Sequence, residues 1–339
     1  MRHRCASSTV KFGCLLKNTP TMKKTRQIRI IEVKSEVGAG TRGASLGVDA
    51  VKIAALDFRS SFFKTRRSIN IPDDNMALYG TVESRYAKRI RSVIKMYERI
   101  GAAVRDSLKD GKFPIIISGD HSNAGGTISG IKMAYPDSRM GAIWIDAHAD
   151  MHSPYTSPSG NMHGMPLASV LGEDNIENKV NDLDYETIEL WERLKNVGDI
   201  TPKLDYRDLL FMTMRDFEEQ EGYLLKKNKV KNFTTSEIRK TGVTKVCREA
   251  MKYLAPCDKV YVSFDVDSMD PTISRGTGTP VKGGINEREA ADIILELVQN
   301  ERVCALEFTE INPTLDSENV MAETVFEILS KVARQIEQI

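Results

Sequence analysis

Short apolar runs alternate along the chain with longer segments in which apolar residues recur at helical spacing. Most of the runs are continuously apolar and rich in Ile, Val, Leu or aromatic residues, as expected for strands covered on both faces. We predict strands at Ile28–Val33, Pro114–Ser118, Gly141–Asp146, Leu209–Met214, Lys259–Val266 and Val303–Phe308. We predict helices at Val82–Leu108, Ala124–Ala134, Tyr185–Leu194, Ala290–Gln299 and Met321–Gln338. This alternation indicates a single α/β domain in which helices cover both faces of a mainly parallel sheet.

The composition excludes several classes of protein. The 339 residues include 48 Lys and Arg against 47 Asp and Glu, a formal net charge of +1. We therefore expect neither nucleic acid nor an anionic membrane as a partner. No apolar run approaches the roughly 18–20 residues of a membrane span. The five cysteines are scattered without a C-x-x-C pair, which argues against a disulfide framework or zinc knuckle and favours a cytoplasmic setting.

Residues 1–26 differ in composition from the rest of the chain. They hold seven Lys or Arg residues and no Asp or Glu. This composition is compatible with an organellar transit peptide, but we favour a disordered tail, or an upstream start before an initiator at Met22. The predicted organisation is a basic tail at 1–26 followed by one domain at 27–339.

One glycine-rich segment after the first strand fits the dinucleotide fingerprint G-x-G-x-x-G, at Gly38–Gly43. A nicotinamide-dependent oxidoreductase would also need an acidic residue at the end of a second strand about 20 residues later. Asp57 falls too early, inside a helical pattern. We therefore interpret these glycines as a flexible loop at a strand end.

Three predicted strands run into polar clusters at their carboxyl ends. The clusters are Ser118–Ser122, Asp146–Asp150 and Asp265–Pro271, and four of the five histidines lie between His121 and His163. The carboxyl ends of strands in an open α/β sheet face the crevice where ligands bind. Alternate residues of a strand share one side, so we expect two groups of side chains to converge: Asp146, His148 and Asp150 in one, and Asp265 and Asp267 in the other.

The composition of these clusters favours a metal centre over unrelated capping aspartates and a core histidine. Buried carboxylates repel one another unless cations neutralise them. Four carboxylates and two imidazoles exceed the needs of one ion and suit two: Asp146, Asp150, Asp265, Asp267, His121 and His148. Ions about 3.5–4 Å apart lower the pKa of a bridging water enough to supply hydroxide near neutral pH. An oxygen-rich set without thiolates favours two Mn²⁺, with Co²⁺, Ni²⁺ or Fe²⁺ as alternatives.

The three clusters resemble motifs of the ureohydrolases, the family of arginase and agmatinase. Its hallmarks are GGDHS, DAHxD and SFDxDxxDP turns, and this chain matches them with Ser118 in place of the first glycine. The resemblance extends from about residue 28 to the C-terminus and implies a doubly wound, parallel, eight-stranded sheet. It also implies the ligands of each ion: His121, Asp146, Asp150 and Asp265 for one, and Asp146, His148, Asp265 and Asp267 for the other.

Within this family, the loop Met151–Gly164 is most similar to that of arginases. Ser159–Gly164 matches S-G-N-x-H-G, and Glu310–Pro313 is similar to E-V-N-P. Arg215–Glu221 resembles R-D-x-D-x-x-E, with Glu218 in place of the second Asp. The resemblance implies a cytoplasmic, binuclear manganese arginase that hydrolyses L-arginine to L-ornithine and urea by attack of a metal-bridging hydroxide on the guanidinium carbon. A homo-oligomer, a trimer or hexamer, is also implied.

The chemistry of a guanidinium substrate assigns roles to three residues. Glu310 can pair with the cation, because a planar guanidinium suits a carboxylate. Asp150 can accept the proton of the attacking hydroxide, and His163 can carry a proton to the departing amine.

The other expected substrate contacts lie at the amino-acid end of the pocket. They are His152, Ser157, Ser159, Asn161, Glu218 and Glu221. His152 and Ser157 depart from the Asn and Thr that arginases usually have, at positions that serve the substrate α-carboxylate. We expect His152 to line the pocket mouth rather than to bind metal. Two alternatives remain: another guanidino-compound hydrolase, of agmatinase or guanidinobutyrase type, and a catalytically silent metal-binding homologue, although every ligand position is filled.

Overall fold

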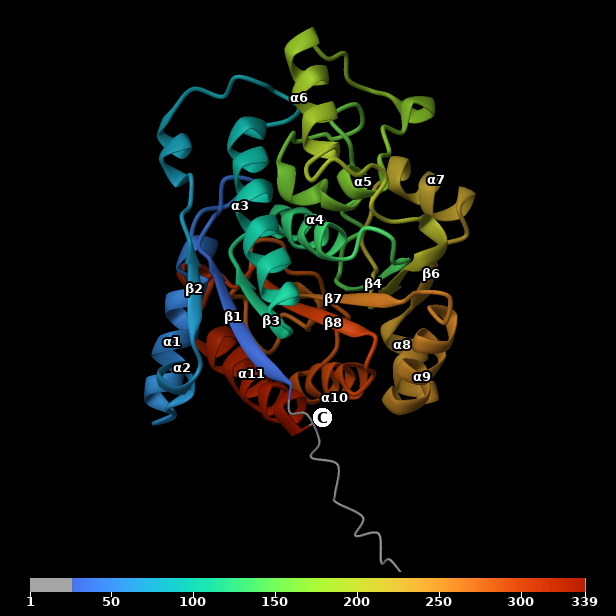
Figure 1. The fold of residues 1–339 in the computed structure, drawn as a ribbon. Helices are drawn as coiled ribbons and strands as arrows, with labels where there is room; N and C mark the ends of the chain where they lie inside the picture. Colours follow the sequence, from blue (N-terminus) through green and yellow to red (C-terminus); the bar gives the residue numbers. More distant parts are fainter. Residues whose placement is uncertain (1–25, 339) are drawn as a thin grey trace, which may run out of the picture.

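An eight-stranded sheet forms the centre of the computed structural model, which describes residues 26–338 (Figure 1). The strand order is β2-β1-β3-β8-β7-β4-β5-β6, and every neighbouring pair is parallel. The strands are β1 (Gln27–Val33), β2 (Ser68–Ile71), β3 (Lys112–Ser118), β4 (Met140–Ile145), β5 (Leu209–Met212), β6 (Lys231–Phe233), β7 (Lys259–Asp265) and β8 (Val303–Thr309).

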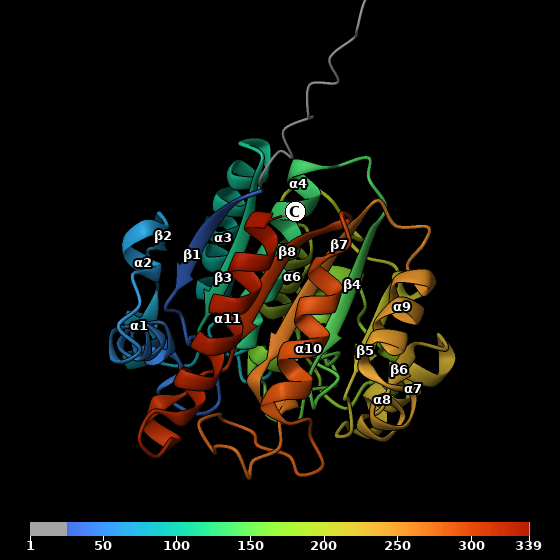
Figure 2. The ribbon, with the colours of Figure 1, turned by 90° about the horizontal axis from the view of Figure 1, so that it is seen from below.

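Helices cover both faces of the sheet and bury an apolar core on each side (Figures 1 and 2). One layer comprises α3 (Ile90–Lys109), α4 (Ala124–Ala134), α5 (Pro166–Leu171), α6 (Tyr185–Lys195) and α7 (Glu219–Lys227). The other comprises α1 (Gly47–Asp57), α2 (Phe62–Thr65), α8 (Thr235–Thr241), α9 (Val243–Tyr253), α10 (Glu287–Val298) and α11 (Val320–Gln338). The predicted α/β class with helices on both faces is confirmed, and the sheet is wholly rather than mainly parallel.

The six predicted strands are present, whereas the two edge strands, β2 and β6, were not predicted. Every residue of β4 and β8 is buried, which accounts for their continuous apolar runs. The edge strands read Ser-Ile-Asn-Ile and Lys-Asn-Phe, and each has only one buried residue. β2 holds only two alternating apolar residues and β6 only one, so neither strand contains a continuous apolar run like those of the central strands.

The helix predicted at Val82–Leu108 begins later than expected, at Ile90. Arg89, at its N-cap, has φ 58°, which ends any continuous helix on its N-terminal side. The preceding residues pack elsewhere, since the Lys88 N–H donates to the carbonyl of Gly160 at 2.8 Å. This contact ties the segment before α3 to the loop Met151–Gly164.

The prediction of a disordered tail falls almost wholly on residues 1–25, outside the described part of the chain. Arg26 is described, and its guanidinium donates to the carbonyls of Glu301 and Val303 at 3.1 and 3.0 Å. Among residues 26–338, no helix combines the length and apolarity needed to cross a membrane.

Candidate metal centre

A cavity of about 410 Å³ opens at the carboxyl edge of the sheet, beside the ends of the central strands. Of the site residues predicted from the sequence, only Asp146 is not part of its wall, and Asp146 is fully buried. The wall is formed by His121, His148, Asp150, His152, Ser157, Pro158, Ser159, Asn161, His163, Gly164, Asp216, Glu218, Glu221, Asp265, Asp267, Thr279, Pro280, Val281 and Glu310.

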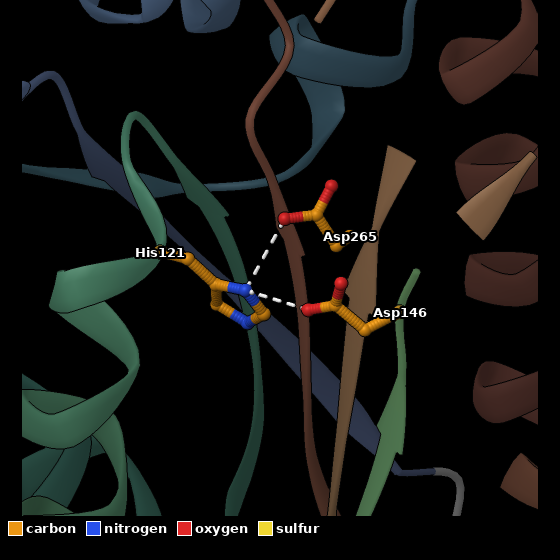
Figure 3. Close-up of side chains that lie close together, drawn as sticks. All are labelled: His121, Asp146 and Asp265. Carbon is orange, nitrogen blue, oxygen red and sulfur yellow. Dashed lines mark ion pairs between the residues drawn. The ribbon is translucent and has the colours of Figure 1, made fainter. Parts of the chain in front are cut away.

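His121 is the centre of a first group of potential metal ligands (Figure 3). Its Nδ1 lies 3.0 Å from Asp146 Oδ2, 2.9 Å from Asp150 Oδ2 and 3.2 Å from Asp265 Oδ2. Three chain segments supply these side chains: the turn after β3, the turn after β4 and the end of β7. All four side chains are at least nine-tenths buried.

His148 is the centre of a second group, which shares Asp146 with the first. His148 Nδ1 lies 2.9 Å from Asp267 Oδ2 and 3.6 Å from Asp146 Oδ1. Asp146 thus directs one carboxylate oxygen toward each imidazole. A carboxylate in this position suits two ions held side by side.

Tight turns, rather than strand alternation, bring these side chains together. β4 ends at Ile145, and the Asp146 carboxylate accepts the N–H of His148 at 2.7 Å, while Asp150 has φ 51°. Asp265 ends β7 and accepts the N–H of Asp267 at 2.8 Å, at the start of a short 3-10 helix. The predicted side chains therefore converge, but not in the groups that strand alternation predicts, because Asp150 and Asp265 face His121 and Asp267 faces His148. The turns are held instead by backbone N–H groups that donate hydrogen bonds to the aspartate carboxylates.

Two buried polar atoms at the first group have no hydrogen-bond partner. They are His121 Nδ1 and Asp146 Oδ2. These two atoms lie 3.0 Å apart, but their angles do not fit a hydrogen bond. A buried polar atom without a partner costs roughly 1–3 kcal/mol. A cation between these atoms would remove this cost, so the donor set fits a metal.

The electrostatics of the carboxylates also favour bound cations. Burial and the charges of Asp267 and Asp146 raise the pKa of Asp265 well above its usual range. Burial and the charge of Asp146 raise the pKa of Asp150 and of Asp267. Asp146 itself keeps a lowered pKa despite its burial, because two imidazoles lie beside it. Divalent cations would keep all four groups ionised.

The orientation of His121 is fixed by two residues that the sequence did not single out as functional. Its Nε2 lies 2.8 Å from the Ser263 hydroxyl, and its ring stacks on Trp144 with centroids 4.2 Å apart and planes inclined by 9°. These contacts direct Nδ1 toward the carboxylates. Partners of this kind set the orientation and basicity of a ligating imidazole.

We expect Ser263→Ala to weaken metal binding at the His121 group by about 10- to 100-fold, because the imidazole loses its orienting partner. Chelator competition measures the affinity. Ser129→Ala is the control, since it removes a buried hydroxyl that donates to the Gly125 carbonyl within α4, away from the ligand groups. Equal metal affinity in wild type and Ser263→Ala would show that the Ser263 contact does not support the site.

Glu310 and His163 form a pair on the cavity wall, next to the turn that carries His121. Glu310 Oε1 accepts the N–H of His121 at 2.8 Å and lies 3.5 Å from His163 Nδ1. Burial opposes the charge on Glu310, but the His163 contact and the His121 N–H lower its pKa. The same contact raises the pKa of His163 against the effect of burial. Glu310 is thus a buried carboxylate held ionised beside an imidazole.

The glycine-rich segment Gly38–Gly43 packs against the site and is not a free, flexible loop. The Gly38 N–H donates to Asp120 Oδ2 at 3.0 Å, and its carbonyl accepts the N–H of His163 at 3.1 Å. The Arg42 carbonyl accepts from Asn312 at 2.9 Å. These backbone groups support the turn that carries His121 and the loop that carries His163.

His152, Glu218 and Glu221 form a third compact group at the outer end of the cavity. His152 Nε2 lies 3.1 Å from Glu218 Oε2, and His152 Nδ1 lies 3.0 Å from the Thr156 hydroxyl. Glu221 is buried, and its carboxylate accepts the N–H groups of Met151 and Glu218. Its pKa rises to about 8, mainly through burial. The Glu218–Glu221 capping box of α7 already accounts for this arrangement.

Asp216 and the segment Thr279–Val281 are wall residues that sequence reasoning missed. The Thr279 hydroxyl donates to Asp267 Oδ2 at 3.2 Å, and Arg215 donates to the carbonyls of Asp267 and Val281. Arg215 thus fixes the long loop after β7 against the second ligand group. The run Gly276–Pro280 was the available signal, because a Gly- and Thr-rich stretch after a strand marks a loop.

Comparison with known proteins agrees with this geometry. A sequence model of the Arginase family matches residues 26–334. The arginase of Brevibacillus brevis is 34% identical over 313 residues, covering 91% of this chain and 97% of that protein. The arginase of Bacillus subtilis (strain 168) is 33% identical, covering 92% and 98%. The solved structure of Bacillus caldovelox arginase has a TM-score of 0.77 and 30% identity, covering 91% of this chain and 98% of that one. The chain therefore belongs to the arginase family.

Proposed function

We propose that this protein is a binuclear manganese arginase that hydrolyses L-arginine to L-ornithine and urea. The observation that carries the proposal is the position of Asp146, which directs one oxygen toward each of two imidazoles beside a cavity. Glu310 and His163 lie on the wall of the same cavity, next to the turn that carries His121, and Glu310 would pair there with a guanidinium. The names of the relatives support the same substrate. A cytoplasmic location and a trimeric or hexameric assembly belong to the same proposal.

Six side chains would hold the two Mn²⁺. His121, Asp146, Asp150 and Asp265 would bind one ion, and Asp146, His148, Asp265 and Asp267 the other. When bound, the ions would act as Lewis acids that lower the pKa of a water, so that hydroxide is available near neutral pH. Co²⁺, Ni²⁺ and Fe²⁺ also suit such ligands.

Glu310, Asp150 and His163 would then divide the remaining work. The Glu310 carboxylate pairs with the guanidinium and holds its carbon next to the ligand cluster. Asp150 accepts a proton as the water oxygen bonds to that carbon. As the carbon–nitrogen bond breaks, the departing amine nitrogen takes the proton held by Asp150 and a second proton from His163, and so leaves as an ammonium. The proton of the new C–OH group passes to His163, which leaves urea.

The proton-transfer role predicts a specific kinetic change in His163→Asn. We expect kcat to fall by about 10²-fold, because general acid catalysis contributes at least that much, while KM changes little. Imidazole added to the assay should restore part of the rate. Steady-state kinetics on arginine measure both constants. Unchanged kinetics in this variant would remove His163 from the mechanism.

A second candidate, another guanidino-compound hydrolase, is favoured by one observation at the outer end of the cavity. The residue at position 152 is a histidine that bonds to Glu218 and Thr156, whereas arginases usually have Asn at this position.

Other residues of the same wall favour arginine, because Ser157, Ser159 and Asn161 can donate hydrogen bonds to a carboxylate. This donor-rich wall supports arginine over agmatine.

The proposal is tested by stripping the protein of metal, reloading it with Mn²⁺, and measuring bound manganese and urea together. We expect two ions per chain and urea from arginine in the reloaded protein only. Two tightly bound ions without urea from arginine, agmatine or guanidinobutyrate would identify a catalytically silent homologue. A single tightly bound ion in an active enzyme would contradict the binuclear mechanism.

A further inference from the structure

The segment before α3 contacts the loop Met151–Gly164, which supplies part of the cavity wall. Three contacts join the two segments. The Lys88 N–H donates to the Gly160 carbonyl at 2.8 Å, and Lys88 Nζ donates to Asn161 Oδ1 at 3.1 Å. Gly160 has φ 73°, and a Cβ placed there would lie 2.0 Å from the carbonyl oxygen of Arg85. Only glycine permits this close approach.

The position of Lys88 is fixed by the packing of its neighbours. Ala87 is fully buried, and its N–H donates to the Ser84 hydroxyl at 3.2 Å. The same hydroxyl lies 2.9 Å from the Thr187 hydroxyl in α6. The half-buried Lys88 is therefore held against Asn161, a residue of the cavity wall, by a turn that is itself anchored.

An ammonium group can only donate hydrogen bonds, so it decides which way the Asn161 amide turns. The amide oxygen faces Lys88, and the Asn161 NH₂ group is left on the other side. That nitrogen lies above Gly40, where a Cβ would come within 2.6 Å of it. Among residues 26–338, no acceptor receives a hydrogen bond from this NH₂ group. Both of its donors remain available to an anion in the cavity.

We infer that Lys88 is a positioning residue that makes the cavity selective for guanidino substrates bearing a carboxylate. It holds the Asn161 amide with its NH₂ group toward that carboxylate and adds a positive charge behind it. This inference rests on the proposed function and deepens it, since it assigns part of the substrate preference to a residue outside the loop Met151–Gly164. A flipped amide would instead present its oxygen to the carboxylate and repel it.

The test compares Lys88→Met with wild type on arginine and on agmatine, which lacks the carboxylate. We expect KM for arginine to rise about tenfold, as for the loss of a charge-assisted hydrogen bond. We expect kcat to change less than about twofold, and kcat/KM for agmatine to stay within the same range. Lys88→Arg, which keeps a cationic donor, should restore much of the arginine KM. Arg85→Gln is the matched control. This substitution also removes one positive charge from the segment, but the Arg85 side chain lies over the Tyr86 ring.

A double-mutant cycle separates positioning from a general charge effect. If Lys88 acts through Asn161, then Lys88→Met should change KM less than about twofold in an Asn161→Ala background. Additive effects, an equal loss in Arg85→Gln, or equal losses on arginine and agmatine would overturn the inference. If wild type cleaves guanidinobutyrate rather than arginine, the proposed function fails, and the same variants compared on that acid still decide the role of Lys88.

Discussion

Asp146→Ala is expected to abolish urea production and to lose both metal ions. Within residues 26–338, Asp146 is the one carboxylate whose two oxygens face different imidazoles, and it is fully buried. Its removal leaves His121 and His148 without the charge they share. We expect bound manganese to fall below one ion per chain and kcat/KM to fall by at least about 10³-fold, since enzymes contribute rate enhancements of about 10⁶ or more. Elemental analysis and urea release measure the two effects.

Two comparisons make the Asp146 result specific. His121→Ala should lose less metal, because His121 belongs to only one of the two groups. Asp270→Asn is the control: this carboxylate lies in the same motif but accepts hydrogen bonds from Thr272, Gly283 and Gly284 outside the cavity wall. Added Mn²⁺ should raise the Tm of wild type and of the Asp270 variant, but not that of Asp146→Ala. Full manganese occupancy in Asp146→Ala would contradict the shared-ligand assignment.

Glu310→Gln is expected to remove activity without removing metal. The glutamine keeps the shape of the side chain, and its oxygen can still accept the N–H of His121, so the turn beside the ligands should persist. The negative charge is lost, however, and the guanidinium loses its buried partner. Breaking a buried charge pair costs roughly 2–5 kcal/mol, which corresponds to a loss of about 30- to 4,000-fold in kcat/KM.

The measurements that separate these effects are manganese content and steady-state kinetics on the same preparation. Two ions per chain with a collapsed kcat/KM would match a role in binding the guanidinium. Loss of metal in Glu310→Gln would show that the residue acts through the His121 turn instead. Near-normal kinetics would remove Glu310 from the substrate site.

The sequence predicted the central strands and the ligand clusters because both are local features. The buried parallel strands are mostly apolar, and polar residues directly after them stand out, as Asp146 and His148 do after β4. The edge strands β2 and β6 lack this contrast. The start of α3 at Ile90 goes with a contact between Lys88 and Gly160, which is distant in sequence. A contact of this kind cannot be detected from the spacing of apolar residues along the helix.

The supporting residues of the site could not be predicted for the same reason. Ser263 and Trp144 lie within apolar strands, and only the register of β4 beside β7 places them next to His121. Arg215 was noted for its motif, but its bonds to the loop after β7 depend on how that loop folds back. Direct ligands follow from residue type and spacing, whereas their supports follow from the fold.

The central claim is tested most directly by the substrate preference of the Mn²⁺-loaded protein. Arginine and agmatine differ by the α-carboxylate, so their ratio of kcat/KM measures what the outer wall of the cavity contributes. A site that pairs polar groups of its substrate strongly rejects an analogue that lacks them. We predict that arginine is preferred by roughly 10²-fold or more, a preference moderated by a partly hydrated rim. Faster cleavage of agmatine or guanidinobutyrate than of arginine would contradict the arginase assignment and leave only membership of the wider family.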